Sequence, residues 1–216
     1  MIARAAGGLV GSVAAAAPVQ TKPSGHIGPN AVTRLAEAVD ELHGHAATRA
    51  LFVMAGLEGY LDQAPVDMVD EAEVIALHRF GRAQFGTEAF AGIARMAGEL
   101  TGRYVLQHRI PHVAQAILRR LPAFLAARVL VRAIAAHAWT FVGSGAFAFT
   151  PHRHGMLLTI NDSPLARDER SPLPLCNFYS ATFETIFRRL VSRRATVIEV
   201  SCAATGARAC RFEVRY

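Results

Sequence analysis

Hydrophobic residues recur every three or four positions up to about His137, and this spacing predicts amphipathic helices. The first helix is expected over 31–45 with Asn30 as its cap, and a short apolar segment, 51–61, follows it. The further helices expected from the same spacing are 67–86, one from a cap at Thr87 to a stop at Gly102, 111–120, and one restarted at Pro122.

The pattern changes to strand-like alternation after Gly145. Two strands, 146–150 and 155–162, are expected around a turn at Pro151, and the proline-rich segment 161–175 is typical of an exposed loop. The elements expected last are an amphipathic helix, 177–190, and a hairpin of strands 196–204 and 209–216 with Gly206 in its turn. This order predicts an α+β fold whose helical N-terminal half packs on an antiparallel sheet.

Composition excludes several classes of protein. The chain has 216 residues, of which 52% are hydrophobic and 19% charged, so it can bury a sizeable core and is neither disordered nor collagen-like. No membrane span is expected, because Gly143 and Gly145 divide the uncharged run 133–151. The alanine-rich residues 1–26, which faintly resemble a signal peptide, are expected to be a flexible extension of a single domain, 27–216.

The basic side chains are nearly all arginine, since Lys22 is the only lysine, and the formal net charge is +6. Arginine suits planar anions such as carboxylates and phosphates. The pairs Arg188–Arg189 and Arg193–Arg194 have no interleaved aromatic residues or DNA-reading motif, so we expect no nucleic-acid partner. The acidic residues between Glu58 and Glu73 are interpreted as a solvated helix surface.

The three cysteines all lie near the C-terminal end, at Cys176, Cys202 and Cys210. An odd number is a poor disulfide framework and favours a reducing compartment. The hairpin should bring Cys202 and Cys210 together, with Glu199 on its first strand and Cys176 at the start of the late helix. Three thiolates and a carboxylate suit a closed, structural zinc site; the alternative is three small buried thiols and a surface glutamate.

The zinc site requires the side chains of Glu199 and Cys202 to lie on the same side of the hairpin. Glu199 and Cys202 are three residues apart, so a regular strand would place their side chains on opposite faces. The site therefore requires a bulge, or a turn that begins near Ser201.

The C-terminal tail resembles the 4-vinyl reductase (V4R) domain family. The shared features are a cysteine before an amphipathic helix, Glu199-x-x-Cys202, a turn glycine and the run from Cys210 to Val214, within a motif core of about 150–216. The resemblance implies zinc bound by Cys176, Glu199, Cys202 and Cys210. It also implies a Bet-three-like fold with a buried apolar pocket, and a homodimer.

The whole chain resembles the bacteriochlorophyll-biosynthesis members of this family, which are named for reducing a vinyl group on a chlorophyll precursor. The resemblance implies a cytoplasmic protein that contacts biosynthetic enzymes and, at most, the surface of the photosynthetic membrane. No glycine-rich dinucleotide motif lies between a strand and a helix, so binding and escort of a tetrapyrrole is favoured. The alternatives are a vinyl reductase that uses flavin or a partner's electrons, and a small-ligand sensor.

A pocket for a magnesium porphyrin or chlorophyllide needs flat apolar walls, an axial ligand and cations for carboxylates. The candidate walls are Trp139, Phe141, Phe147 and Phe149. The candidate ligands and cations are His137, His152, His154, Arg128 and Arg132, with His108 and His112 as a more distant pair. Each also has an ordinary structural explanation: the aromatic residues as core, His137 as a hydrogen-bonded core histidine, and His152 and His154 as part of a solvated turn.

Overall fold

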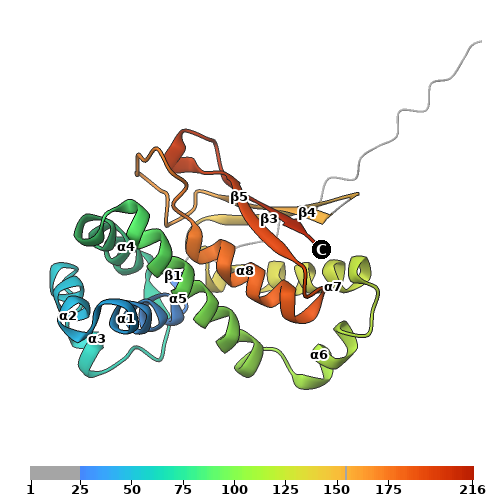
Figure 1. Ribbon diagram of the computed structural model, residues 1–216, viewed down its shortest axis with the longest axis horizontal. Coiled ribbons are helices and arrows are strands. Elements are labelled where there is room, and N and C mark those ends of the chain that lie inside the picture. The colour runs from blue at the N-terminus through green and yellow to red at the C-terminus, as the bar shows by residue number, and fades with distance from the viewer. Residues whose placement is uncertain (1–24, 154) are drawn as a thin grey trace, which may run out of the picture.

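The computed structural model describes residues 25–153 and 155–216. The helices of this part are α1 (Asn30–His43), α2 (His45–Met54), α3 (Gly59–Asp62), α4 (Glu71–Phe85), α5 (Thr87–His108), α6 (His112–Leu118), α7 (Ala123–Ala136) and α8 (Asn177–Leu190). Helices α1 to α4 gather at one end of the molecule, α6 and α7 lie at the other, and α5 runs between the two ends (Figure 1).

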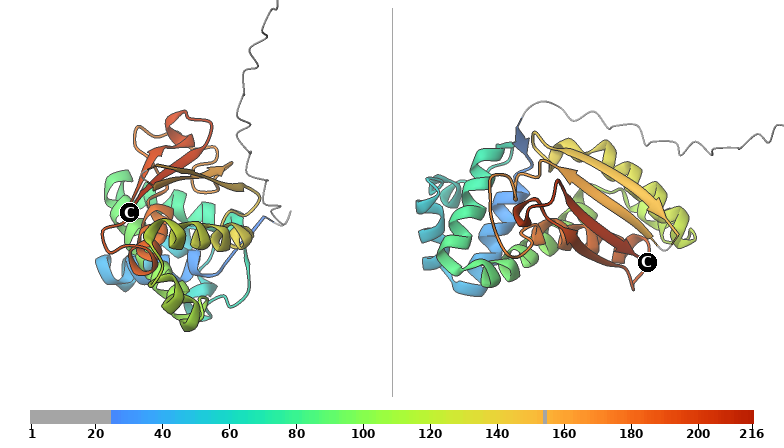
Figure 2. Two further views of the ribbon diagram at one scale, coloured as in Figure 1. Left: turned by 90° about the vertical axis from the view of Figure 1, so that its right-hand side faces the viewer. Right: turned by 90° about the horizontal axis from the view of Figure 1, so that it is seen from above.

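A four-stranded antiparallel sheet covers α8 and α7, as Figure 2 shows from above. Its strands, in spatial order, are β3 (Ala146–His152), β4 (Gly155–Asn161), β6 (Cys210–Arg215) and β5 (Thr196–Ser201). A small second sheet pairs β1 (His26–Ile27) with β2 (Val69–Asp70). The α+β architecture, with a helical N-terminal half packed on an antiparallel sheet, is confirmed.

Helix α5 packs along α8, and two glycines make this close approach possible. A Cβ on Gly98 would lie 2.2 Å from the carbonyl oxygen of Phe178, and one on Gly102 would lie 2.7 Å from the Cβ of Thr185. The predicted helix stop at Gly102 is therefore wrong: this glycine lies inside α5, where its missing side chain admits α8.

Several other predicted boundaries shift. Gly44, with φ of +80°, ends the first helix at His43, two residues before its predicted end, and the predicted apolar segment 51–61 is shared between α2 and α3. Asn30 and Thr87 are first residues of their helices rather than caps, and Asp70 caps α4 by accepting a hydrogen bond from the amide of Ala72 at 2.8 Å. The β3–β4 turn follows His152, and Pro151 lies within β3, paired with Met156. The expected extension at 1–26 lies mostly outside the described residues.

The segment between β4 and α8, predicted to be an exposed loop, is buried in part from Ser163 to Ala166. Arg167 anchors it to the helical half, because its guanidinium lies 2.8 Å from the carboxylates of both Glu71 and Asp162. Glu71 also accepts hydrogen bonds from the amide and hydroxyl of Ser144. The predicted acidic surface is therefore wrong at Glu71, a partly buried carboxylate that joins three segments of the chain.

Candidate functional site

The last hairpin contains the irregularity that the candidate metal site requires. Glu199 pairs with Phe212, but Ser201 pairs with Arg211, so β5 holds one residue more than β6 between these pairs. This bulge reverses the strand phase after Glu199. It brings the Glu199 carboxylate and the Cys202 sulfur to the same place in the fold.

Cys176 joins this group from the start of α8, where it is the residue before the first turn. Its sulfur lies 3.3 Å from that of Cys210, and the Cys210 sulfur lies 3.8 Å from that of Cys202. One ligand atom from each of Cys176, Glu199, Cys202 and Cys210 lies within 4.8 Å of all the others. We call these four residues the Cys/Glu cluster; their donor atoms are spaced closely enough to hold one metal ion.

Backbone amides surround the sulfurs and favour their charged forms. The amide of Leu175 donates to the Cys202 sulfur and the amide of Ala203 to the Cys210 sulfur, each at 3.4 Å. The amide of Cys176 donates to Oε2 of Glu199 at 2.9 Å. Hydrogen bonds to a charged ligand stabilise that charge and orient the ligand.

Burial opposes negative charge on the cluster when no cation is bound. Burial and the neighbouring Cys202 sulfur raise the pKa of Glu199 to about 8, and burial raises the pKa of Cys176 well above its usual range. Hydrogen bonds from the other two thiols lower the pKa of Cys202. Oε1 of Glu199 is buried and has no hydrogen-bond partner. A bound divalent ion would favour the charged forms of these groups and satisfy this oxygen, so the residues fit a metal.

The predicted pocket aromatics lie on the helix-facing side of the sheet or at its border. The rings of Phe141 and Phe147 meet edge to face at 5.7 Å between centroids, and Phe141 meets Phe183 of α8 at 5.9 Å. Phe147 is fully buried, whereas Trp139 and Phe149 are half-buried. These rings fill space against one another, and their role in ligand binding stays a prediction.

The predicted polar partners lie apart from these rings. His137 is exposed rather than buried in the core, and its Nδ1 lies 2.9 Å from the carbonyl oxygen of Ala133. His152 lies at the end of β3, with its Nε2 3.4 Å from the Glu213 carboxylate. Arg128 and Arg132 are exposed on α7, and His154 lies outside the described residues.

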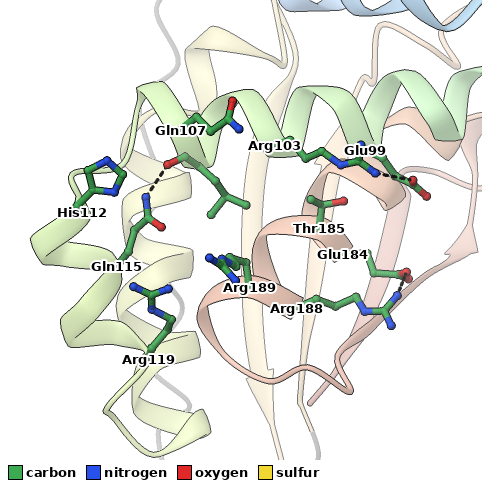
Figure 3. Close-up of a pocket in the computed structure, with 11 residues that line it drawn as sticks. Glu99, Arg103, Gln107, His112, Gln115, Arg119, Glu184, Thr185, Arg188 and Arg189 are labelled. Atoms are coloured by element: carbon green, nitrogen blue, oxygen red, sulfur yellow. Dashed lines mark hydrogen bonds and ion pairs between the residues drawn. The ribbon is translucent and has the colours of Figure 1, made fainter. Parts of the chain in front are cut away.

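A polar cleft of about 650 Å³ opens between α5, α6 and the end of α8 (Figure 3). Arg103, Arg119, Arg188 and Arg189 line it together with His112. The cleft has two carboxylates for its four arginines. Glu184 lies 2.9 Å from Arg95 and 3.4 Å from Arg188, and Glu99 lies 3.5 Å from Arg95 and 3.9 Å from Arg103. The cleft therefore carries excess positive charge and is suited to anions.

Sequence reasoning singled out His112 and the pair Arg188–Arg189 but not Arg103 or Arg119. The available signal was the absence of any Asp or Glu from 100 to 161, a stretch that holds both of these arginines.

A V4R domain model matches residues 156–216, the stretch that holds the entire Cys/Glu cluster. This match places a V4R domain in the C-terminal part of the chain. Two relatives are each called bacteriochlorophyll synthase 23 kDa chain. The one from Cereibacter sphaeroides is 42% identical over 87% of this chain and 89% of its own length. The one from Rhodobacter capsulatus is 39% identical over 93% and 91%. The chain belongs to the family of these bacteriochlorophyll synthase 23 kDa chains.

Solved structures with the same fold have little sequence in common with this chain. An Fe(II) unliganded H-NOX protein from K. algicida aligns with a TM-score of 0.58 at 9% identity, over 88% of this chain and 96% of that one. A structure concerned with modulating heme redox potential through porphyrin distortion aligns with a TM-score of 0.51 at 10% identity, over 88% and 100%. At these identities the likeness concerns the fold alone.

Proposed function

We propose that this protein is an accessory chain of bacteriochlorophyll biosynthesis that binds a chlorophyll precursor and presents it to a biosynthetic enzyme. The observation that carries the proposal is the 42% identity, over most of both chains, to a protein called a chain of bacteriochlorophyll synthase. An accessory role agrees with the Cys/Glu cluster, whose four residues would complete a closed four-coordinate site with no open position for chemistry.

The metal in this proposal is zinc, and its role is structural. Cys176 precedes α8, Glu199 lies on β5, and Cys202 and Cys210 flank the hairpin turn, so a shared ion would fasten the hairpin to the helix. Thiolates select soft or borderline ions, and a tetrahedral set of three sulfurs and one oxygen suits zinc. Because the ligands come from separate segments, binding the ion would stabilise the folded state.

The ligand in this proposal is a tetrapyrrole such as magnesium protoporphyrin or a chlorophyllide. Support comes from the bacteriochlorophyll context of the relatives and from a fold shared with a structure concerned with heme and porphyrin distortion. Two regions supply suitable groups. Phe141 and Phe149, which are half-buried, supply apolar surface, and the cleft supplies the His112 imidazole and arginines for carboxylates.

A pigment titration tests this proposal. Magnesium protoporphyrin is added to the purified protein, and a shifted Soret band that saturates at one pigment per chain is the expected result. An unshifted band at micromolar concentrations contradicts the proposal. In a parallel reaction, a divinyl chlorophyllide is supplied with NADPH. Loss of the vinyl group would identify a reductase and replace the escort function.

The remaining parts of the proposal concern assembly and location. We infer a homodimer in a reducing compartment, in contact with a bacteriochlorophyll-biosynthesis enzyme. Among the described residues, no helix combines the length and the apolar character needed to cross a bilayer. We further propose that contact with the photosynthetic membrane, where it occurs, is at the membrane surface. Size-exclusion chromatography with light scattering measures the oligomeric state directly.

A further inference from the structure

The charge of the chain is unevenly distributed. Residues 100–161 contain no Asp or Glu, and they hold Arg103, Arg109, Arg119, Arg120, Arg128, Arg132 and Arg153. Helices α6 and α7 occupy the middle of this stretch and lie at the end of the molecule opposite α1 to α3 (Figures 1 and 2). This end of the protein is therefore strongly basic.

The same two helices expose large apolar side chains. On α6, Val113 and Ile117 are one turn apart and are 72% and 55% exposed. On α7, Phe124, Leu125 and Val129 are 53%, 39% and 51% exposed. Side chains of this size usually face the core, so their concentration on two neighbouring helices indicates a contact surface.

Helix α7 shows how the apolar and basic residues are combined. One face is buried and consists of Ala126, Ala127, Leu130, Val131 and Ala135. The opposite face holds Leu125, Arg128, Val129 and Arg132 at the spacing of one helical surface. None of Arg119, Arg120, Arg128 and Arg132 forms an ion pair with a carboxylate among the described residues.

We propose that the exposed face of α6 and α7 docks on a membrane surface rich in anionic phospholipids. We call this face, made up of Val113, Ile117, Phe124, Leu125, Val129 and the three arginines 120, 128 and 132, the α6–α7 face. Its apolar side chains enter the boundary between headgroups and acyl chains, while the guanidiniums extend outward to lipid phosphates. Helices that lie in a membrane interface combine apolar and basic residues in this way.

Charge decides between a membrane and a second copy of this chain. A two-fold contact would set the α6–α7 face against itself and bring the three arginines of each copy together. No carboxylate of the segment 100–161 is available to neutralise them. An anionic lipid surface supplies the missing negative charge without constraining which lipid pairs with which arginine.

Sedimentation of the full chain with vesicles tests the proposal, which is independent of pigment binding. The chain should sediment with vesicles that contain an anionic phospholipid, and less with pure phosphatidylcholine or at high salt. The double variant Arg128→Gln/Arg132→Gln should weaken binding by roughly fivefold per arginine. The double variant Phe124→Ser/Val129→Ser should weaken it at unchanged charge.

A matched control uses apolar side chains exposed elsewhere. Ile198 and Val200 on β5 are 58% and 55% exposed, and Ile198→Ser/Val200→Ser should leave vesicle binding unchanged. The proposal is overturned if the full chain does not sediment with anionic vesicles, or if the control variant loses binding equally. It is also overturned if the α6–α7 variants dissociate an oligomer and leave vesicle binding intact, because the face would then join two copies.

Discussion

The metal-site proposal makes a sharp prediction for Glu199→Gln. Glutamine has the same shape as a protonated glutamate, and the raised pKa of Glu199, about 8, means that the metal-free carboxyl is protonated at neutral pH. The amide oxygen of glutamine can still accept the hydrogen bond from the Cys176 amide. In metal-free protein the substitution should therefore change the free energy of unfolding by less than about 1 kcal/mol.

With zinc bound, the same substitution removes a direct ligand. Loss of even an outer partner of a ligand weakens metal binding by about 10- to 100-fold, so the loss of Glu199 should cost at least that much. At saturating zinc this is about 1.4–2.8 kcal/mol of stability, since each tenfold change in affinity is about 1.4 kcal/mol. For a domain of this size it lowers Tm by about 3–10 °C.

Thermal unfolding in zinc and in a chelator is the assay. Glu213→Gln is the matched control, because Glu213 lies on the neighbouring strand β6, half-buried, and pairs with Arg215 at 3.4 Å outside the cluster. The difference in Tm between Glu213→Gln and the unsubstituted protein should be the same in zinc and in the chelator. If Glu199→Gln destabilises the protein equally with and without zinc, the carboxylate is not a ligand and the reasoning is refuted.

Three further predictions concern residues of α4 and α5 that stabilise the fold. Glu71→Gln should cost about 1–3 kcal/mol in urea unfolding at pH 7. Burial raises the pKa of Glu71, but hydrogen bonds from Ser144 and Arg167 outweigh it and hold the pKa below its ordinary 4.5, so this contribution is present above that pH and is lost as pH falls through the folded pKa. If Glu71→Gln costs the same free energy of unfolding at every pH down to 2, this explanation is contradicted. His78→Leu should stabilise the protein by about 1–2 kcal/mol, since both ring nitrogens are buried without partners. It should also remove the acid sensitivity below pH 6.5 that burial causes by lowering the pKa of His78 to about 3; a destabilised variant would show that His78 has a partner. Gly98→Ala should cost about 1–3 kcal/mol, because the new Cβ would lie 2.2 Å from the Phe178 carbonyl oxygen, whereas Gly92→Ala on the open side of α5 should cost nothing. Equal Tm values for these two would argue against the close packing of α5 on α8.

The fold class could be predicted from the sequence because helical spacing gives way to alternation at one place, after Gly145. Helix ends were harder to predict because glycine has two uses. Gly44 ends a helix through its positive φ, whereas Gly102 continues one and permits contact with Thr185. Gly102 can be recognised as an interior helix residue only from the position of α8, which is distant in sequence.

The residues of the Cys/Glu cluster could be predicted from the sequence, and so could the need for a bulge in the strand that carries Glu199. The three-residue spacing of Glu199 and Cys202 requires a bulge, and the structure has one at that place. The distances between the sulfurs could not be predicted, because they depend on how α8 meets the hairpin.

The ligand pocket was the least predictable part. A run of aromatic residues does not reveal whether its rings meet a ligand or one another, and Phe141 and Phe147 meet each other. The basic cleft forms where α5, α6 and α8 meet, and the local sequence pattern of each helix does not predict this meeting. Charge segregation over 100–161 was the one sequence signal that pointed to this end of the molecule.

The most direct test of the central claim is the absorbance spectrum of the protein purified from a host that makes bacteriochlorophyll. A carrier of chlorophyll precursors should elute with tetrapyrrole absorbance in the Soret and red regions, in proportion to its own concentration. A colourless protein from the same pigmented cells, folded and carrying its metal, would contradict the account.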